Sequence, residues 1–451
     1  MTLLAINWAD IGVQAAQFVF SFSIIVVLHE LGHYFPAKWF KCRIEKFYLF
    51  FNPWFSIFKK KIGDTEWGLG WIPFGGYVKI SGMIDESMDK EQMKLPPEPW
   101  EFRSKPAWQR LIIMVGGVVV NLFLGFFIYA MMLWHWGEEY LPVNNLTYGI
   151  VADSLGKSIG LKDGDKIVTL DGKHVEKLAP QNQIALNIIL KDAKTFQVER
   201  DGKPAEVAIP SDFAGKLIKY RDINFITPRL PGIVDSVNPG SVAAKSGLQK
   251  GDKLLAINDQ PLPYFHEFKK GIVQNKGKDI TITYLRGTDT GKLKTTVPAT
   301  GILGFSSVDE EKLLTIKKIS YTLWESFPAA IRVSKETLQN YWLQLKLIFS
   351  GKVKASESVG SVFSIAKMYS TTWDWQGLWR MTAFFSLVLA LMNILPIPAL
   401  DGGHALFTLI EMITGRKPSD KFIERAQMVG MVLLLGLMAY ALGLDIFRMF
   451  K

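Results

Sequence analysis

His29, Glu30 and His33 stand together in the stretch VVLHELGHYFPAK, at the end of a long apolar run. Two histidines four residues apart lie on one face of a helix, one turn above the other, so both imidazoles can reach one metal ion. The glutamate next to the first histidine then approaches the water on the metal rather than the metal itself. A catalytic zinc site uses three protein ligands and leaves a fourth position for water, so the pattern predicts a hydrolytic zinc site that needs one more ligand.

The third ligand has two candidates near the end of another apolar segment, NILPIPALDGGH. Asp401 is the favoured candidate and His404 the runner-up. Pro396 and Pro398 break helical hydrogen bonding before them, and broken backbone at membrane depth is tolerated only where it lines a protein cavity or water. An Asp-Gly pair can also cap a short helix, which would leave the zinc with two ligands. The single cysteine, Cys42, excludes an internal disulfide and any multi-cysteine metal site.

Four apolar segments can position these residues, because a helix that crosses the hydrocarbon needs about 20 mostly apolar residues. The segments are residues 11–28, 111–134, 381–400 and 428–444. Hydrophobic residues make up 49% of the 451 residues, which is typical of a membrane protein. The first segment has neither a basic start nor a small-residue cleavage site, so we interpret it as a retained helix and not as a signal peptide.

The placement of Lys and Arg predicts the orientation, since these residues accumulate on the cytoplasmic side. Lys38, Lys41 and Arg43 follow the first segment at once, which predicts that the His-Glu-His end of that helix faces the cytoplasm. Arg448 and Lys451 argue weakly against the resulting outside position of the C-terminus. The net charge of +10 follows the apolar segments rather than forming a basic tract with interleaved aromatics, so nucleic-acid binding is not expected.

The region between the second and third apolar segments contains an internal repeat. GLKDGDKIVTLDGKHV begins at Gly160, GLQKGDKLLAINDQPL begins at Gly247, and each is preceded by GIV. The Gly-Asp pair indicates a tight turn before an apolar strand. This pattern resembles the circularly permuted PDZ domain, which binds an extended peptide at a sheet edge. Two small β domains without a ligand remain the alternative.

Two further segments have more than one interpretation. The stretch WIPFGGYVKISG at 71–82 predicts a hairpin around Gly75 and Gly76, with Tyr77 continuing as strand. It can fold back into the membrane or lie at the headgroup level. Residues 318–350 have apolar residues at helical spacing, which predicts an amphipathic helix on the outer membrane surface or a connecting helix packed on the second repeat.

Taken together, the HELGH motif, Gly117 and Asn121 in the second segment, the tandem repeats and the Asn393-x-x-Pro-x-Pro-x-x-Asp401-Gly motif resemble the site-2 protease family of intramembrane zinc metalloproteases. The resemblance covers nearly the whole chain and is greatest to bacterial members with periplasmic PDZ domains. Two features depart from the family pattern: Val118 stands where a proline is usual, and the extension FFNPWFSIFKKK precedes the 71–82 segment. The resemblance implies zinc ligands His29, His33 and Asp401, the general base Glu30, and substrate contacts by Asn393, Asn121, Gly75, Gly76 and Tyr77.

We therefore expect a multi-pass α-helical membrane protein with four transmembrane helices and two inserted β-rich PDZ-like domains. The expected ranges are 1–36, 107–136, 376–403 and 424–446 for the membrane helices, 37–106 for a cytoplasmic loop with a membrane-associated β-hairpin, 146–226 and 227–305 for the PDZ-like domains, and 318–350 for the amphipathic helix.

The resemblance implies a zinc-dependent endopeptidase in the bacterial inner membrane, with its active site near the cytoplasmic face and periplasmic PDZ-like domains. Its substrates would be single-span membrane proteins such as anti-sigma factors or remnant signal peptides, cut within the bilayer, and peptide C-termini are possible PDZ ligands. The alternative is a membrane-anchored PDZ adaptor with a non-catalytic metal site, which a replacement of Glu30 would have favoured. A metal-ion transporter would spread polar residues through several helices, whereas here they cluster at two helix ends.

Overall fold

The computed structural model of this chain describes residues 8–83, 96–179, 183–220, 225–350 and 360–449. Parts of the expected ranges 1–36, 37–106 and 146–226, and Lys451, lie outside the described residues. The chain divides into two compact units. Unit 1 consists of residues 1–137 and 320–451, and unit 2 of residues 138–319. Unit 2 is therefore an insertion between two helices of unit 1.

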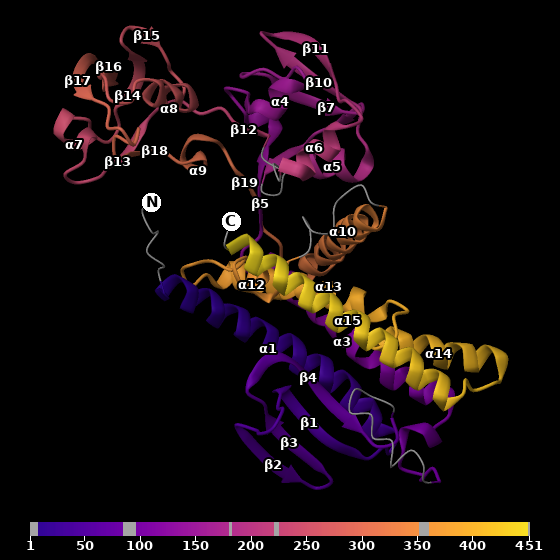
Figure 1. Cartoon of the computed structure of the whole chain (residues 1–451). Helices are drawn as coiled ribbons and strands as arrows, with labels where there is room; N and C mark the ends of the chain where they lie inside the picture. The colour runs from indigo at the N-terminus through magenta and orange to yellow at the C-terminus, as the bar shows by residue number, and fades with distance from the viewer. Residues whose placement is uncertain (1–7, 84–95, 180–182, 221–224, 351–359, 450–451) are drawn as a thin grey trace. The chain divides into compact units, whose positions relative to one another are not determined.

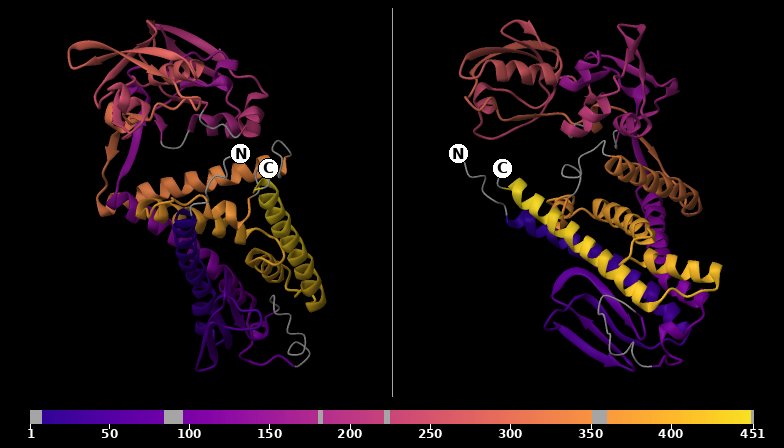
Figure 2. Two further views of the ribbon diagram at one scale, coloured as in Figure 1. Left: turned by 60° about the vertical axis from the view of Figure 1, so that its left-hand side comes forward. Right: turned by 45° about the vertical axis from the view of Figure 1, so that its right-hand side comes forward.

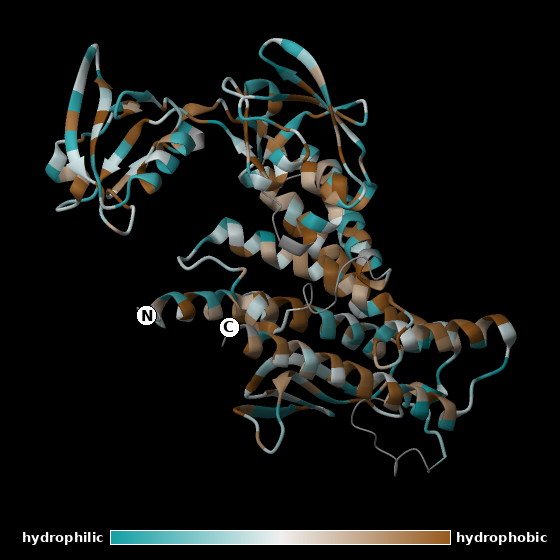
Figure 3. Cartoon of the chain, turned by 45° about the horizontal axis from the view of Figure 1, so that its top comes forward, coloured by the Kyte–Doolittle hydropathy of each residue, from teal (hydrophilic) through white to brown (hydrophobic). Residues whose placement is uncertain are grey.

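Within the described residues of unit 1, four helices are long and apolar enough to cross a membrane, as the sequence predicts (Figures 1 and 3). They are α1 (Trp8–Trp39), α3 (Ala107–His135), α13 (Trp375–Ile394) and α15 (Asp420–Met449). Buried residues of α1, such as Ile25 and His29, recur on one side, whereas most apolar side chains of α15 are exposed. This is the burial expected of helices whose outer surface meets lipid rather than water.

Unit 1 also contains shorter helices and one long polar-capped helix. They are η1 (Phe102–Ser104), α10 (Leu323–Phe349), α12 (Val362–Ala366) and α14 (Asp401–Thr414). A capping box starts α10: the Thr322 hydroxyl accepts from the backbone N–H of Glu325, and the Glu325 carboxylate accepts from the backbone N–H of Thr322. Ala329 and Ala330 of α10 are buried in one core cluster with Ile128 of α3. The amphipathic helix expected at 318–350 thus packs on α3 in this structure.

A four-stranded sheet follows α1 and lies against its C-terminal part in every view of Figures 1 and 2. Its strands are β1 (Ile44–Phe51), β2 (Phe58–Ile62), β3 (Thr65–Leu69) and β4 (Ile72–Ile80), in the order β2-β3-β1-β4. The hairpin expected around Gly75 and Gly76 is wrong. Both glycines lie within β4, which pairs antiparallel with β1, and the hairpin is formed by β2 and β3.

Unit 2 contains two copies of one arrangement, which explains the sequence repeat. Each copy has a four-stranded sheet, in the order β11-β10-β7-β8 or β17-β16-β14-β15, and a separate strand pair, β12-β6 or β13-β18. The first copy comprises β6 (Ile150–Ala152), α4 (Ser154–Ser158), β7 (Lys166–Leu170), β8 (Lys173–His174), α5 (Gln183–Lys191), β10 (Thr195–Arg200), β11 (Lys203–Ala208), α6 (Phe213–Tyr220) and β12 (Ile226–Pro228).

The second copy comprises β13 (Val234–Val237), α7 (Val242–Ser246), β14 (Lys253–Ile257), β15 (Gln260–Pro261), α8 (Phe265–Gln274), β16 (Asp279–Arg286), β17 (Asp289–Thr296) and β18 (Phe305–Ser307). The remaining elements of unit 2 are β5 (Glu138–Pro142), η2 (Val143–Asn145), β9 (Lys177–Ala179), α9 (Glu310–Leu313) and β19 (Lys317–Ile319). Strands β5 and β19 pair with each other, so the two ends of the insertion meet in one sheet. Each copy has its own apolar core.

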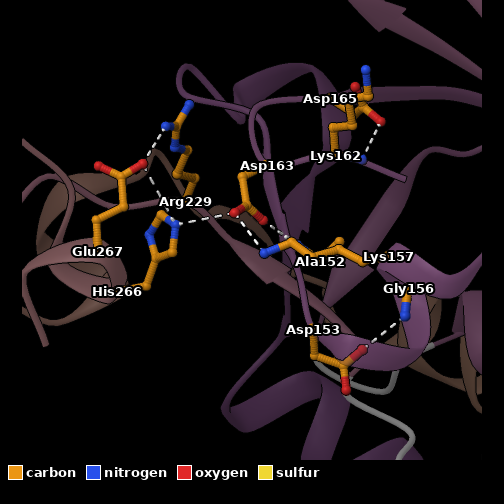
Figure 4. Close-up of polar contacts among 10 residues, drawn as sticks. All are labelled: Ala152, Asp153, Gly156, Lys157, Lys162, Asp163, Asp165, Arg229, His266 and Glu267. Atoms are coloured by element: carbon orange, nitrogen blue, oxygen red, sulfur yellow. Dashed lines mark hydrogen bonds and ion pairs between the residues drawn. The ribbon is translucent and has the colours of Figure 1, made fainter. Parts of the chain in front are cut away.

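A cluster of charged side chains joins the two copies (Figure 4). Arg229 donates to Glu267 at 2.8 Å and stacks its guanidinium over the ring of Tyr264 at 3.5 Å. His266 lies 3.5 Å from Asp163 of the first copy and 3.8 Å from Glu267. Burial lowers the pKa of His266 below its usual value, against the pull of the two carboxylates. These contacts link residues that the sequence repeat itself does not relate.

Candidate metal centre

His29 and His33 lie one turn apart near the C-terminal end of α1, and both side chains are buried. Their Nε2 atoms are 3.3 Å apart. Oδ2 of Asp401, the first residue of α14, lies 3.3 Å from Nε2 of His29 and 3.4 Å from Nε2 of His33. The three atoms therefore form a nearly equilateral triangle, contributed by two segments far apart in the sequence.

This triangle has the size that zinc requires. Ligand atoms about 2.0–2.1 Å from a tetrahedral centre are about 3.3 Å from one another, which matches all three distances. Among the described residues, His29, His33 and Asp401 form the group with metal-ligating potential. Oδ2 of Asp401 is buried and has no hydrogen-bond partner among the described residues, as expected of an atom that binds a cation. Two imidazoles and a carboxylate suit zinc.

The break between α13 and α14 brings Asp401 to this place. Helix α13 ends at Ile394 and α14 begins at Asp401, with Leu400 as the N-cap. Asp401 is thus the first residue inside α14 and not its N-cap, so the capping alternative does not account for it. Gly403 allows the tight turn, because a Cβ there would lie 2.6 Å from the carbonyl oxygen of Ile397.

An ion pair fixes α14 against α3. Nη2 of Arg110 donates to Oε1 of Glu411 at 2.5 Å, and both side chains are largely buried.

His404, the runner-up ligand, lies outside the metal-ligating triangle and has Gln427 of α15 as its hydrogen-bond partner. The structure thus brings Asp401, and not His404, to the two histidines.

Helix α3 holds the other face of both histidines. Nδ1 of His33 lies 2.8 Å from the carbonyl oxygen of Ile113, and Nδ1 of His29 lies 3.2 Å from the side-chain amide of Asn121. Asn121 is fully buried, and its backbone oxygen accepts from the hydroxyl of Ser386 at 2.7 Å. Both Nε2 atoms are consequently turned toward Asp401. No sequence signal points to Ile113, because it acts through its backbone, or to Ser386.

The close approach of α1 and α3 depends on glycines. A Cβ at Gly32 would lie 2.6 Å from the carbonyl oxygen of Gly116. A Cβ at Gly117 would lie 2.6 Å from Cε1 of His29. Helix α3 is continuous from Ala107 to His135, so Val118, which stands where a proline is usual in the family pattern, introduces no break.

The metal triangle forms part of the wall of a cavity of about 560 Å³. Glu30 lies in the same wall, beside His29 and His33, and Gly76 and Tyr77 of β4 line another part. Gly76 packs against α1, since a Cβ there would lie 2.7 Å from Cγ1 of Val26. Residues of the two distant motifs and of the 71–82 segment therefore line one space.

The remaining predicted site residues lie close to this cavity. Nδ2 of Asn393, at the end of α13, lies 3.3 Å from Nε2 of His29. Gly75 has a positive φ of 75° and would, with a Cβ, lie 2.9 Å from the ring of Phe51. The Tyr77 hydroxyl donates to Oδ1 of Asn52 at 2.9 Å. Asn52 lines the cavity too and was not singled out from the sequence.

Comparison with known proteins agrees with this geometry. The model of peptidase family M50 matches residues 17–437. The chain is 26% identical to the regulator of sigma-E protease RseP of Escherichia coli, covering 96% of this chain and 98% of that protein. It is 27% identical to the protease RseP of Yersinia pestis, covering 99% and 100%. It is 28% identical, over 96% and 98%, to a protein of Neisseria meningitidis whose name contains the words zinc metalloprotease.

Proposed function

This chain belongs to peptidase family M50 and is a zinc metalloendopeptidase, and from that premise we propose that it cuts single-span membrane proteins within the bilayer. The observation that carries the proposal is the triangle of His29, His33 and Asp401 beside Glu30, in a cavity among membrane-spanning helices. Ionisable residues at membrane depth are costly and mark function.

His29, His33 and Asp401 hold the zinc ion in this proposal. Bound there, zinc supplies a Lewis acid that polarises the scissile carbonyl and lowers the pKa of water. Glu30 is the general base: its carboxylate takes the proton from the attacking water and then gives it to the departing amine. Glu30 follows His29 directly in the helix and lines the same cavity, so its position suits this role.

We propose that Asn121 orients His29 rather than contacting the substrate. Asn121 is buried, and its Oδ1 has no hydrogen-bond partner among the described residues. An amide rotated so that Oδ1 accepts the Nδ1–H of His29 satisfies this oxygen and leaves the Nε2 lone pair for zinc. The Ile113 carbonyl does the same for His33. Asn393 stays the proposed substrate contact, because its amide is partly buried and borders the metal centre.

Strand β4 is the proposed docking edge for the substrate. It is an edge strand of its sheet and borders the cavity through Gly76, Tyr77 and Val78. A helical segment hides its carbonyls in internal hydrogen bonds, so it must be extended locally before cleavage, and an extended segment can pair with such an edge. Substrate helices weakened by Pro, Gly or Asn should then be cut faster. Rates that ignore these residues would count against this step.

The proposal includes the partners and placement expected from the family. The substrates are single-span proteins such as anti-sigma factors or remnant signal peptides, in a bacterial inner membrane with the metal centre near the cytoplasmic face. The repeats of unit 2 are periplasmic PDZ-like domains. In the second repeat, β18 pairs with β13. Phe305 of β18 lies next to Phe265 and Phe268 of α8. A strand edge beside a helix suits the C-terminus of a peptide.

The test compares the wild-type chain with Glu30→Gln on a purified single-span peptide. Glutamine keeps the size of the side chain but cannot accept the proton, so cleavage should fall by roughly 10²–10⁴-fold, while the zinc content stays that of the wild type. Glu139→Gln makes the same change at an exposed residue of unit 2 and should leave cleavage unchanged. A Glu30→Gln variant that cuts at the wild-type rate would make the mechanism wrong, and a wild-type chain that does not cut the peptide would favour a PDZ adaptor.

A further inference from the structure

The loop between β1 and β2, together with Trp71 between β3 and β4, presents an aromatic cluster to the outside of unit 1. Trp54 is 91% exposed, Phe55 58% and Trp71 38%, and these three residues are called the aromatic tip below. The rings of Phe55 and Trp71 lie nearly parallel, with centroids 5.6 Å apart, and Trp54 stacks on the other indole at 6.1 Å. Large apolar side chains gathered on a surface mark an interaction site.

The backbone fixes the outward direction of this tip. Trp54 has a φ of 71°, which is a strained conformation for a bulky residue and persists only where the surrounding structure enforces it. The Nε1–H of Trp71 donates to the carbonyl oxygen of Pro53 at 2.9 Å and ties the two sides of the tip together. The exposed indole of Trp54 is therefore a built feature of the loop.

The strand register places the tip beside the apolar part of α1, which is long enough to cross a membrane. Ile44 and Ile80, at the base of β1 and β4, pack in one cluster with Ala37 at the end of α1. Four residues further along β4, Gly76 lies against Val26, inside the apolar part of α1. The strands thus run from the end of α1 back along its membrane-spanning part, and the tip lies at their far end.

Three lysines lie behind the tip on strand β2. Lys59, Lys60 and Lys61 pair with Gly68, Trp67 and Glu66 of β3, in a direction that leads back toward the base of the sheet. At about 3.3 Å per residue, these lysines lie roughly 3–10 Å closer to the base than Phe58, the first residue of β2. All three are exposed, and none makes an ion pair with another described residue.

An edge strand often carries lysines to prevent pairing with another sheet. That role explains the charges on β2 but not the exposed aromatic tip next to them. The aromatic tip and the lysines behind it have the arrangement of an interfacial membrane anchor. In such an anchor, aromatic rings enter the acyl region and ammonium groups reach the phosphates of the headgroups. Charge complementarity then selects anionic lipids.

We propose that residues 53–61, together with Trp71, bind anionic phospholipids of the leaflet that surrounds the C-terminal end of α1. The aromatic tip lies among the acyl chains, and Lys59, Lys60 and Lys61 contact the phosphates. Pro53 also lines the catalytic cavity, so the bound lipid holds the cavity wall formed by this loop in place. The extension that departs from the family pattern thereby gains a role of its own.

The test uses the full chain in lipid vesicles. Cys42→Ser removes the native thiol, and the new cysteine of Trp54→Cys carries an environment-sensitive aromatic fluorophore. Quenching by nitroxides on the acyl chains is measured in pure phosphatidylcholine and with about one-third phosphatidylglycerol. The anionic lipid should increase quenching at least twofold, and 0.5 M salt, which screens exposed charges, should remove most of the increase. Changing all three lysines to Gln should abolish the dependence on phosphatidylglycerol.

Matched controls separate lipid binding from general damage. Lys173→Gln with Lys203→Gln removes exposed lysines of unit 2 and should leave the quenching of the wild type unchanged. Zinc content reports whether unit 1 remains folded in the triple Lys variant. Quenching that is equal in both lipid mixtures overturns the proposal, as does a triple variant that binds zinc and still responds to phosphatidylglycerol. Since cleavage is not measured, failure here leaves the catalytic proposal intact.

Discussion

At the scale of single residues, the spacing in the sequence predicted the two histidines of the site but not the residues that surround them. Two histidines on successive helical turns share a face by geometry alone, so His29 and His33 could be predicted without a structure. Asp401 could not be chosen over His404 by spacing, because both lie just after the same broken segment. The distances favour the aspartate, whose Oδ2 completes the triangle with the two histidines. The contact of the Ile113 carbonyl could not be predicted from the sequence, because every residue carries a carbonyl.

A first prediction concerns Asn121. If its Oδ1 holds the Nδ1–H of His29, Asn121→Leu removes the acceptor and should weaken zinc binding by about 10–100-fold, the usual effect of losing an outer-shell partner of a ligand. Asn121→Asp keeps an acceptor and should weaken it less. The measurement is competition for zinc between the purified chain and a chelator of known affinity.

The control for Asn121 is another buried polar group away from the metal. Ser21→Ala removes a buried hydrogen bond to Thr382, 2.8 Å long, between α1 and α13. It should cost stability without changing the affinity for zinc. An Asn121→Leu chain that binds zinc as tightly as the wild type would show that His29 does not depend on this amide.

At the scale of elements, the sequence repeat predicted two similar β domains but not what its Gly-Asp pair does. Asp165 and Asp252 are the aspartates of that pair, and both are buried. Each accepts two hydrogen bonds from one arginine, Arg200 or Arg286, at 2.7 Å. Such a bidentate pair ties the turn to a strand more than 30 residues later. The partners could not be predicted, because they follow from sheet pairing and not from local sequence.

The same limit explains the error at Gly75 and Gly76. Two adjacent glycines between apolar runs are a strong local signal for a hairpin. In the structure they instead let β4 pass close to its neighbours, since a Cβ at Gly76 would lie 2.8 Å from the carbonyl oxygen of Tyr48 on β1 and 2.7 Å from Val26. The two glycines therefore allow the close approach of β4 to its neighbours and do not form a turn. Only the position of α1 distinguishes the two uses.

A second prediction tests the packing of α1 on α3. Gly117→Ala places a methyl group within 2.6 Å of the His29 ring, so the imidazoles must shift. Overpacking of this kind costs about 1–3 kcal/mol, and displaced ligands should lower the affinity for zinc at least tenfold. Gly436→Ala, in α15, meets no atom within 4 Å and should leave zinc binding unchanged. Equal zinc affinities for the two variants would contradict the contact.

At the scale of the whole molecule, the proposed metal centre and the inserted repeats lie in different units of the chain. The proposed zinc ligands, Glu30 and the cavity wall all belong to unit 1, which the chain leaves at Gly137 and re-enters at Ser320. The division could be anticipated, because the repeat is flanked by apolar helices. The meeting of β5 and β19 could not, as these strands are three to five residues long and carry no pattern of their own.

The last prediction follows from this separation. A ligand that binds only the folded state adds RT ln(1 + [L]/Kd) to its stability, about 2.7 kcal/mol at a hundredfold excess over Kd. In the proposed site, zinc joins α1 to α14 within unit 1, so its removal by a chelator should raise amide hydrogen exchange around His33 and Asp401. The sheet of β14 and β16 in unit 2 should exchange as before, because its core shares no residue with the metal centre. In Asp401→Ala, which lacks one ligand, the chelator should change neither region. Exchange that rises equally in both units of the wild type would mean that the metal stabilises the molecule as a whole, and the two units would then have to unfold together.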